Sequence, residues 1–162
     1  MKLGKIMRYH FMFLIFLLFG FSTSLFADST VKSQVEVTPV VKKIAGRVDS
    51  IRTLEDFRKL KYVMLSELQY KNYNLFSRRK EKRIRWRRTA TEIFNDHIVY
   101  EGKACTDLTI WFIALCNAHG IETKFAKIRQ GRRVHSVVEL FFLGDWYIYD
   151  ATTNEVPVKG SI

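Results

Sequence analysis

Hydrophobic side chains in the middle of the chain recur every three or four residues, which is the spacing of one face of an α-helix. In the first such segment the recurring positions are Phe57, Leu60, Met64 and Leu68. A helix-starting pattern precedes them, because Thr53 is followed three residues later by Asp56. We therefore predict a helix from Thr53 to about Tyr70, a turn near 72–77, and a second helix over 81–97.

A third helix is predicted over residues 105–118, and it is apolar on nearly every side. Thr106 and Asp107 supply a polar first turn, and Gly120 is placed as a stop signal. A helix without a polar face has to be covered on all sides. It is therefore expected to lie at the centre of the domain.

After the third helix the pattern changes to that of β-strands. Residues 123–128 alternate between polar and apolar, and 134–143 are rich in β-branched and aromatic side chains. A third run, 146–149, follows a turn signal at Gly144-Asp145. Strands joined by short turns form antiparallel sheets, so we predict an α+β fold in which the central helix packs on a small antiparallel sheet.

The first 27 residues have the pattern of an export signal. Lys2, Lys5 and Arg8 precede an apolar run over 11–21 that is short for a membrane span. Cleavage is expected after Ala27, which predicts a periplasmic or secreted protein. The alternative is an uncleaved N-terminal helix that anchors the protein.

Residues 28–50 show no sustained period and contain Pro39 and Gly46. We interpret this segment as a linker or N-terminal arm. The remaining residues, 51–162, are enough for one domain with its own core.

The chain carries a net charge of +11, and much of it is concentrated between residues 78 and 88. The basic residues considered for binding are Arg78, Arg79, Lys82, Arg83, Arg85, Arg87 and Arg88. Such a segment could hold an anionic surface polymer or membrane headgroups, or it could be a solvated helix face. Predicted export argues against nucleic acid as the partner.

The two cysteines, Cys105 and Cys116, are predicted to be independent thiols. If both lie on the central helix, their offset of eleven positions spans about 16 Å, which is too far for a disulfide. Cys116 lies within the apolar stretch and is interpreted as a buried core residue.

Cys105 begins the apolar helix, and that position suits a thiol nucleophile. Unpaired N–H groups and the dipole at a helix start favour the thiolate, and they can stabilise the oxyanion formed when it attacks a carbonyl. His135, at the start of a predicted strand, could accept the thiol proton and later protonate the leaving amine. Asp150 closes the next strand, where its carboxylate could orient the imidazole. The three residues together indicate a cysteine-dependent acyl-transfer enzyme.

Four blocks of sequence in this region carry a family resemblance. They are 102–107, 114–121, 135–140 and 144–152, which read GKACTD, ALCNAHGI, HSVVEL and GDWYIYDAT. In this order they resemble the transglutaminase-like superfamily of papain-like cysteine enzymes, over about residues 101–153. The resemblance implies a catalytic triad of Cys105, His135 and Asp150, a cysteine-bearing helix packed on an antiparallel sheet, and a protein or peptide substrate.

Regular pairing of the last two strands would separate the base from its carboxylate. With the turn at Gly144-Asp145, Asp150 faces Glu139, about 13 Å along the strand from His135. Bringing the two together then requires a bulge, strand coiling or long side chains.

Two functions remain open on the sequence. The first is hydrolysis of amide or peptide bonds, slightly favoured over transfer to an amine. The second is a non-catalytic binding module that uses the basic segment. The candidates for an additional oxyanion donor are Asn95, His97 and Tyr100. For His97 the simpler interpretation is a core-facing position on a helix.

No metal-ligand or phosphate-loop motif is present, so no cofactor is expected.

Overall fold

The helix predicted over residues 105–118 is the centre of the fold. The computed structural model describes residues 34–162 and contains this helix as α7 (Cys105–Ala118). Every side chain from Thr106 to Cys116 is buried, which accounts for the lack of a polar face in the sequence. Gly120, with φ of +72°, ends the helix in the left-handed conformation that glycine adopts readily.

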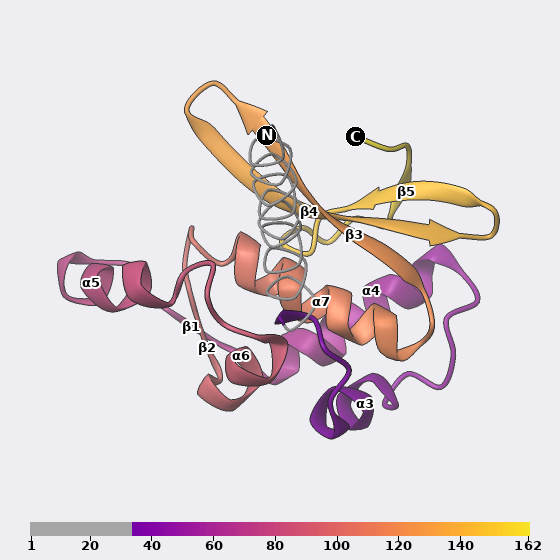
Figure 1. Cartoon of the computed structure of the whole chain (residues 1–162), viewed down its shortest axis with the longest axis horizontal. Coiled ribbons are helices and arrows are strands. Elements are labelled where there is room, and N and C mark those ends of the chain that lie inside the picture. The colour runs from indigo at the N-terminus through magenta and orange to yellow at the C-terminus, as the bar shows by residue number, and fades with distance from the viewer. Residues whose placement is uncertain (1–33) are drawn as a thin grey trace, which may run out of the picture. The chain divides into compact units, whose positions relative to one another are not determined.

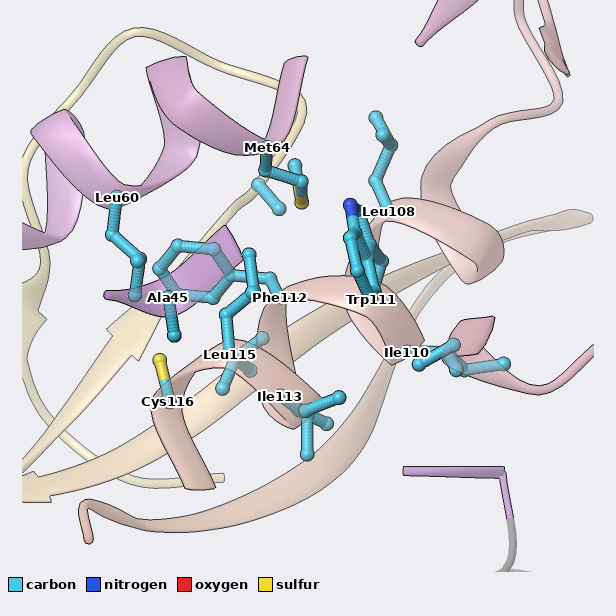
Figure 2. Close-up of a cluster of buried hydrophobic side chains, with 14 of the residues drawn as sticks. Ala45, Leu60, Met64, Leu108, Ile110, Trp111, Phe112, Ile113, Leu115 and Cys116 are labelled. Atoms are coloured by element: carbon cyan, nitrogen blue, oxygen red, sulfur yellow. The ribbon is translucent and has the colours of Figure 1, made fainter. Parts of the chain in front are cut away.

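Aromatic and aliphatic side chains from the surrounding elements pack around α7. The ring centroids of Phe112 and Tyr149 are 4.8 Å apart, and those of Trp111 and Phe94 are 5.7 Å apart. Figure 2 shows Leu60 of a neighbouring helix near Phe112 of α7. These contacts join helices and sheet into one core.

A four-stranded antiparallel sheet covers one side of α7 (Figure 1). Its strands, in spatial order, are β3 (Glu122–Gln130), β4 (Arg133–Phe142), β5 (Asp145–Tyr149) and β6 (Val158–Lys159). In β4, alternate residues Val138, Leu140 and Phe142 belong to the core. The prediction of an α+β fold with an antiparallel sheet is confirmed at this level.

The helix predicted from Thr53 is α4 (Leu54–Ser66). It begins with the predicted capping-box pattern, in which Oδ2 of Asp56 accepts hydrogen bonds from the backbone N–H and from the hydroxyl of Thr53, both at 2.9 Å. The helix ends before Tyr70, because β1 (Gln69–Lys71) pairs in parallel with β2 (Ile98–Tyr100).

Residues 39–45, in the segment predicted as a linker or arm, instead form helix α3 (Pro39–Ala45). Thr38 caps its N-terminus, and Pro39 occupies the first turn, where its missing N–H has no cost. Val41 and Ile44 are fully buried against the core. Pro39 marks the start of this helix. Because the helix has only seven residues, its hydrophobic period could not be recognised in the sequence.

The helix predicted over 81–97 is also corrected. Two helices take its place, α5 (Leu75–Ile84) and α6 (Ala90–Asp96). Asn74 caps the first and Thr89 the second, and Trp86 between them has φ of +67°, which a helix does not allow. Arg87 and Trp86 therefore lie in a connection between helices.

Two further observations concern the whole described region. Cys105 and Cys116 are free thiols, as predicted. Across residues 34–162, none of the helices combines the length and the hydrophobicity needed to cross a bilayer. The predicted signal peptide over 1–27 lies outside the described residues.

Candidate active site

His135 and Asp150 are in direct contact. The Nε2 atom of His135 lies 2.7 Å from Oδ2 of Asp150, a hydrogen-bonded distance. Both side chains remain partly accessible, with 39% and 27% of their surface exposed. With Nε2 engaged by the carboxylate, Nδ1 is the ring nitrogen left for exchanging a proton with a reacting group.

A register different from the predicted one makes this contact possible. The structure pairs Phe142 with Asp145, so the turn consists of Leu143 and Gly144, one residue earlier than predicted. Both turn residues have positive φ, +51° and +86°, as a two-residue type I′ turn requires.

The earlier turn brings Asp150 two residues closer to His135. Continuing the pairing of Val138 with Tyr149 by one residue puts Asp150 opposite Val137, two positions from His135 on the same face. A diagonal separation of about 7–8 Å is within reach of long side chains. No bulge is needed, so the expected obstacle to the pair is removed.

The second oxygen of Asp150 is fixed by the residues that follow it. Oδ1 accepts hydrogen bonds from the backbone N–H of Thr152 at 2.8 Å and from its hydroxyl at 2.7 Å. The carboxylate thus has one oxygen bound to its own loop and one directed at His135. This arrangement restricts its rotation and so orients the imidazole.

A buried lysine supports the same loop from α4. Lys61 is 1% exposed, and its Nζ donates to the carbonyl of Thr153 and, at 2.9 Å, to Oδ1 of Asn154. Burial lowers the pKa of Lys61, while the negative charge of Asp150 acts in the opposite direction.

Lys61 was missed in the sequence, although a signal was present. It lies four residues after Phe57 and three before Met64, on the core-facing side of the predicted helix. A lysine on that side has to find oxygen partners in the interior.

Cys105 is the first residue of α7 and is half-buried. The helix has no side-chain cap, because Ala104 occupies the N-cap position. The N–H groups of the first turn are therefore not engaged by a capping side chain and remain available for an anion.

A buried hydrogen bond joins the start of α7 to the start of β4. Thr106 and Ser136, which directly follow Cys105 and His135, are linked between their hydroxyl oxygens at 3.1 Å. The pairing of β4 with β5 begins only at Val138, so β4 has an open edge at His135. Among the described residues no hydrogen bond joins the Cys105 thiol to His135, whose side-chain partner is Asp150.

The first turn of α7 is held by a buried ion pair. Nη2 of Arg88 lies 2.5 Å from Oδ2 of Asp107, and Nη1 lies 2.9 Å from Oδ2 of Asp96. Burial lowers the pKa of Arg88, but the carboxylates of Asp107 and Asp96 outweigh it and the net shift is upward. Arg88 was predicted as part of a binding surface, and it is instead 4% exposed.

Cys116 differs from Cys105 in accessibility. It is fully buried, and burial raises the pKa of its thiol well above the usual range. The interpretation of Cys116 as a core residue is confirmed by its burial.

The candidate oxyanion donors lie in different settings. Tyr100 is buried in β2, and Asn95 is exposed near the end of α6. His97 is exposed, not core-facing as predicted, and its Nδ1 lies 2.8 Å from the carbonyl of Glu67. Over residues 34–162 there is no cluster of three or more His, Cys, Asp or Glu side chains that could hold a metal ion.

Comparison with known proteins shows a likeness of fold. No family model and no curated protein matches the chain. The structure of a proposed cysteine protease from Cytophaga hutchinsonii matches with a TM-score of 0.57 at 16% sequence identity, over 78% of this chain. The chain spans 42% of the length of that protein. The two share a mixed helix-and-sheet fold.

Proposed function

We propose that this protein is a cysteine-dependent acyl-transfer enzyme of the transglutaminase-like superfamily, acting on amide or peptide bonds. The observation that carries the proposal is the 2.7 Å contact of His135 with Asp150. His135 lies at the open edge of β4, and Ser136 of the same strand is hydrogen-bonded to Thr106 in the first turn of the Cys105 helix. The four sequence blocks and the fold likeness to a proposed cysteine protease support it.

In the first half-reaction the Cys105 thiolate attacks the substrate carbonyl carbon. A C–S bond forms, the carbonyl electron pair moves to oxygen, and the N–H groups at the start of α7 stabilise the oxyanion. When the oxyanion collapses, the C–N bond breaks and the amine leaves with a proton from Nδ1 of His135. The product is a thioester on Cys105.

In the second half-reaction a water molecule or an amine attacks the thioester. Nδ1 of His135 accepts the proton of the attacking group, and Asp150 stabilises the imidazolium through Nε2. Attack by water yields a carboxylic acid and attack by an amine yields a new amide. We favour hydrolysis, in an exported protein whose signal is residues 1–27.

Alkylation of the thiol tests the proposal directly. Iodoacetamide should modify Cys105 in the folded protein faster than a free cysteine at about pH 6, because an imidazolium partner and the helix start stabilise the thiolate. Cys116 is fully buried and should stay unmodified, so peptide mapping assigns the reaction. His135→Ala should slow modification of Cys105 by at least about 10-fold at that pH.

His119→Ala is the matched control, because His119 caps the opposite end of the same helix, about 20 Å away. Cys105 in the His119→Ala variant should be alkylated at the same rate as Cys105 in the protein without substitutions. Slow modification of Cys105 that is insensitive to His135→Ala would contradict the enzymatic proposal.

A second candidate is a non-catalytic module with the same fold. The absence of a Cys105–His135 hydrogen bond in the described region favours it, together with the exposed basic helix α5. Trapping with hydroxylamine separates the two, since an acyl-enzyme formed from a peptide amide releases a hydroxamate. A module that only binds forms none, with or without Cys105→Ser.

A further inference from the structure

Helix α5 is exposed along most of its length. Of its ten residues only Glu81 is buried. At its N-terminal end Leu75 is 83% exposed and Phe76 is 94% exposed. Figure 1 shows α5 at one end of the described part of the chain, away from the four-stranded sheet. Two adjacent large apolar side chains in water are unfavourable and indicate a surface that is covered in use.

Basic side chains follow these two apolar residues along the chain. The exposed cations on α5 and just after it are Arg78, Arg79, Lys80, Lys82, Arg83 and Arg87. Within residues 34–162 none of the six forms a salt bridge. Arg85 and Arg88 are excluded, because the first pairs with Glu81 and the second is buried with Asp107.

The apolar and basic side chains share one side of α5. Arg79 follows Leu75 by four residues and Phe76 by three, and Arg83 follows Arg79 by four, so these positions are neighbours on the helix surface. Glu81 lies on the opposite, buried side. Arg79 and Arg83 repel each other at this spacing, and a negative surface would relieve that repulsion.

We propose that α5 binds the surface of a membrane that contains anionic phospholipids. Leu75 and Phe76 insert at the level of the acyl-chain boundary, and the six cations contact lipid phosphates. A soluble polyanion would neutralise the cations but would leave Leu75 and Phe76 in water, so the apolar pair favours a lipid surface over such a partner.

The position of α5 relates this surface to the candidate active site. Arg88 follows the end of α5 by four residues and is bonded to Asp107 in the first turn of α7. Membrane binding by α5 would therefore hold the Cys105 end of α7 close to the lipid surface. The proposal concerns binding alone and does not require the chemistry proposed for Cys105.

Vesicle sedimentation of the full chain tests this proposal. The probes are vesicles of phosphatidylcholine alone and of an equimolar mixture with phosphatidylglycerol. Each basic residue near an anionic surface contributes about fivefold to partitioning, so Arg79→Glu with Arg83→Glu should weaken binding to the anionic vesicles by roughly 20-fold or more. Leu75→Ser with Phe76→Ser should weaken it by roughly 10-fold.

Matched variants control for charge and hydrophobicity elsewhere. Lys42→Glu with Lys43→Glu makes the same charge change on exposed positions of α3, and Val156→Ser with Val158→Ser removes two other exposed apolar side chains. Both should change binding by less than about threefold. The apolar run over 11–21 is common to all variants, so differences between them report on α5.

Two outcomes would overturn the proposal. One is equal binding by the α5 variants and their controls. The other is a result in which the Arg79 and Arg83 variant loses vesicle binding while the Leu75 and Phe76 variant binds as the unsubstituted protein does. If the unsubstituted protein also binds soluble polyglutamate as tightly as anionic vesicles, the surface is a polyanion site. Alkylation of Cys105 in the α5 variants, measured without vesicles, should remain unchanged, so failure here is distinct from failure of the enzymatic proposal.

Discussion

At the residue scale, the interior position of Lys61 is the feature with the clearest physical cost. Its ammonium group is removed from water and is compensated by a carbonyl, an amide oxygen and the nearby charge of Asp150. The donated hydrogen bonds hold Thr153 and Asn154, which directly follow the segment that fixes Asp150. Lys61 therefore holds the loop that follows Asp150.

Substitution Lys61→Met should change how stability depends on pH. Burial lowers the pKa of Lys61 in the folded protein below its usual value of about 10.4. The unfolded chain then binds more protons than the folded one in the window between these values, so the free energy of unfolding rises as pH rises through that window. The variant lacks this contribution.

Urea unfolding at about pH 7.5 and about pH 10 measures the effect. We compare the free energy of unfolding of the protein without substitutions with that of Lys61→Met. The difference between them, protein minus variant, should be larger at the higher pH. Lys42→Met, which removes an exposed lysine, serves as the control. A difference between the protein and Lys61→Met that is the same at both pH values would contradict the prediction.

At the element scale, the β4–β5 hairpin decides whether the candidate base and carboxylate meet. The pairing follows from a two-residue turn at Leu143 and Gly144. Leu143 is an unusual choice for that turn, because its φ of +51° is strained for a residue with a branched apolar side chain. It is also 75% exposed, so its side chain contributes little packing.

Leu143→Asn should stabilise the protein by about 0.5–1 kcal/mol, because asparagine tolerates positive φ and Asn-Gly is the preferred type I′ pair. Gly144→Ala should destabilise it by about 1 kcal/mol or more. Thermal unfolding measures both. Leu143→Gln removes the exposed apolar side chain without favouring positive φ and should give little gain. A gain equal to that of asparagine would show that the backbone strain is not the cause.

At the scale of the whole molecule, α3 belongs to the same core as the residues that follow it. Val41, Ile44 and Ala45 are buried in the cluster that surrounds α7. His119, at the end of α7, adds a polar link, since its Nε2 lies 3.1 Å from the carbonyl of Ala45. The folded unit therefore includes residues before position 51.

Ile44→Ala should lower the free energy of unfolding by about 2–5 kcal/mol, because it leaves a cavity in this core. Lys43→Ala, at the adjacent exposed position, should change it by less than about 0.5 kcal/mol. Urea unfolding compares the two. A loss below about 1 kcal/mol for Ile44→Ala would mean that α3 is attached loosely, as the sequence interpretation held.

Much of the architecture could be predicted because it depends on local patterns. The continuous apolar run of α7, the capping box of α4, the alternating residues of β3 and the β-branched run of β4 each specify an element without reference to the rest of the chain. The break between α5 and α6 escaped prediction although a local signal was present, because Thr89 and Glu92 form a capping box at the start of α6. The burial of Arg88 beside Asp107 is a tertiary contact and leaves no periodic signal.

The candidate site divides in the same way. Residue type, order and position at the ends of predicted elements were sufficient to select Cys105, His135 and Asp150 as candidates, because helix starts and strand ends are recognisable locally. Whether His135 meets Asp150 was decided only by the folded chain, because a shift of one residue in the turn moves the carboxylate two positions along β4. The roles of Lys61 and Arg88 were likewise decided by packing, since a charged side chain reveals its partners only when the interior that surrounds it has formed.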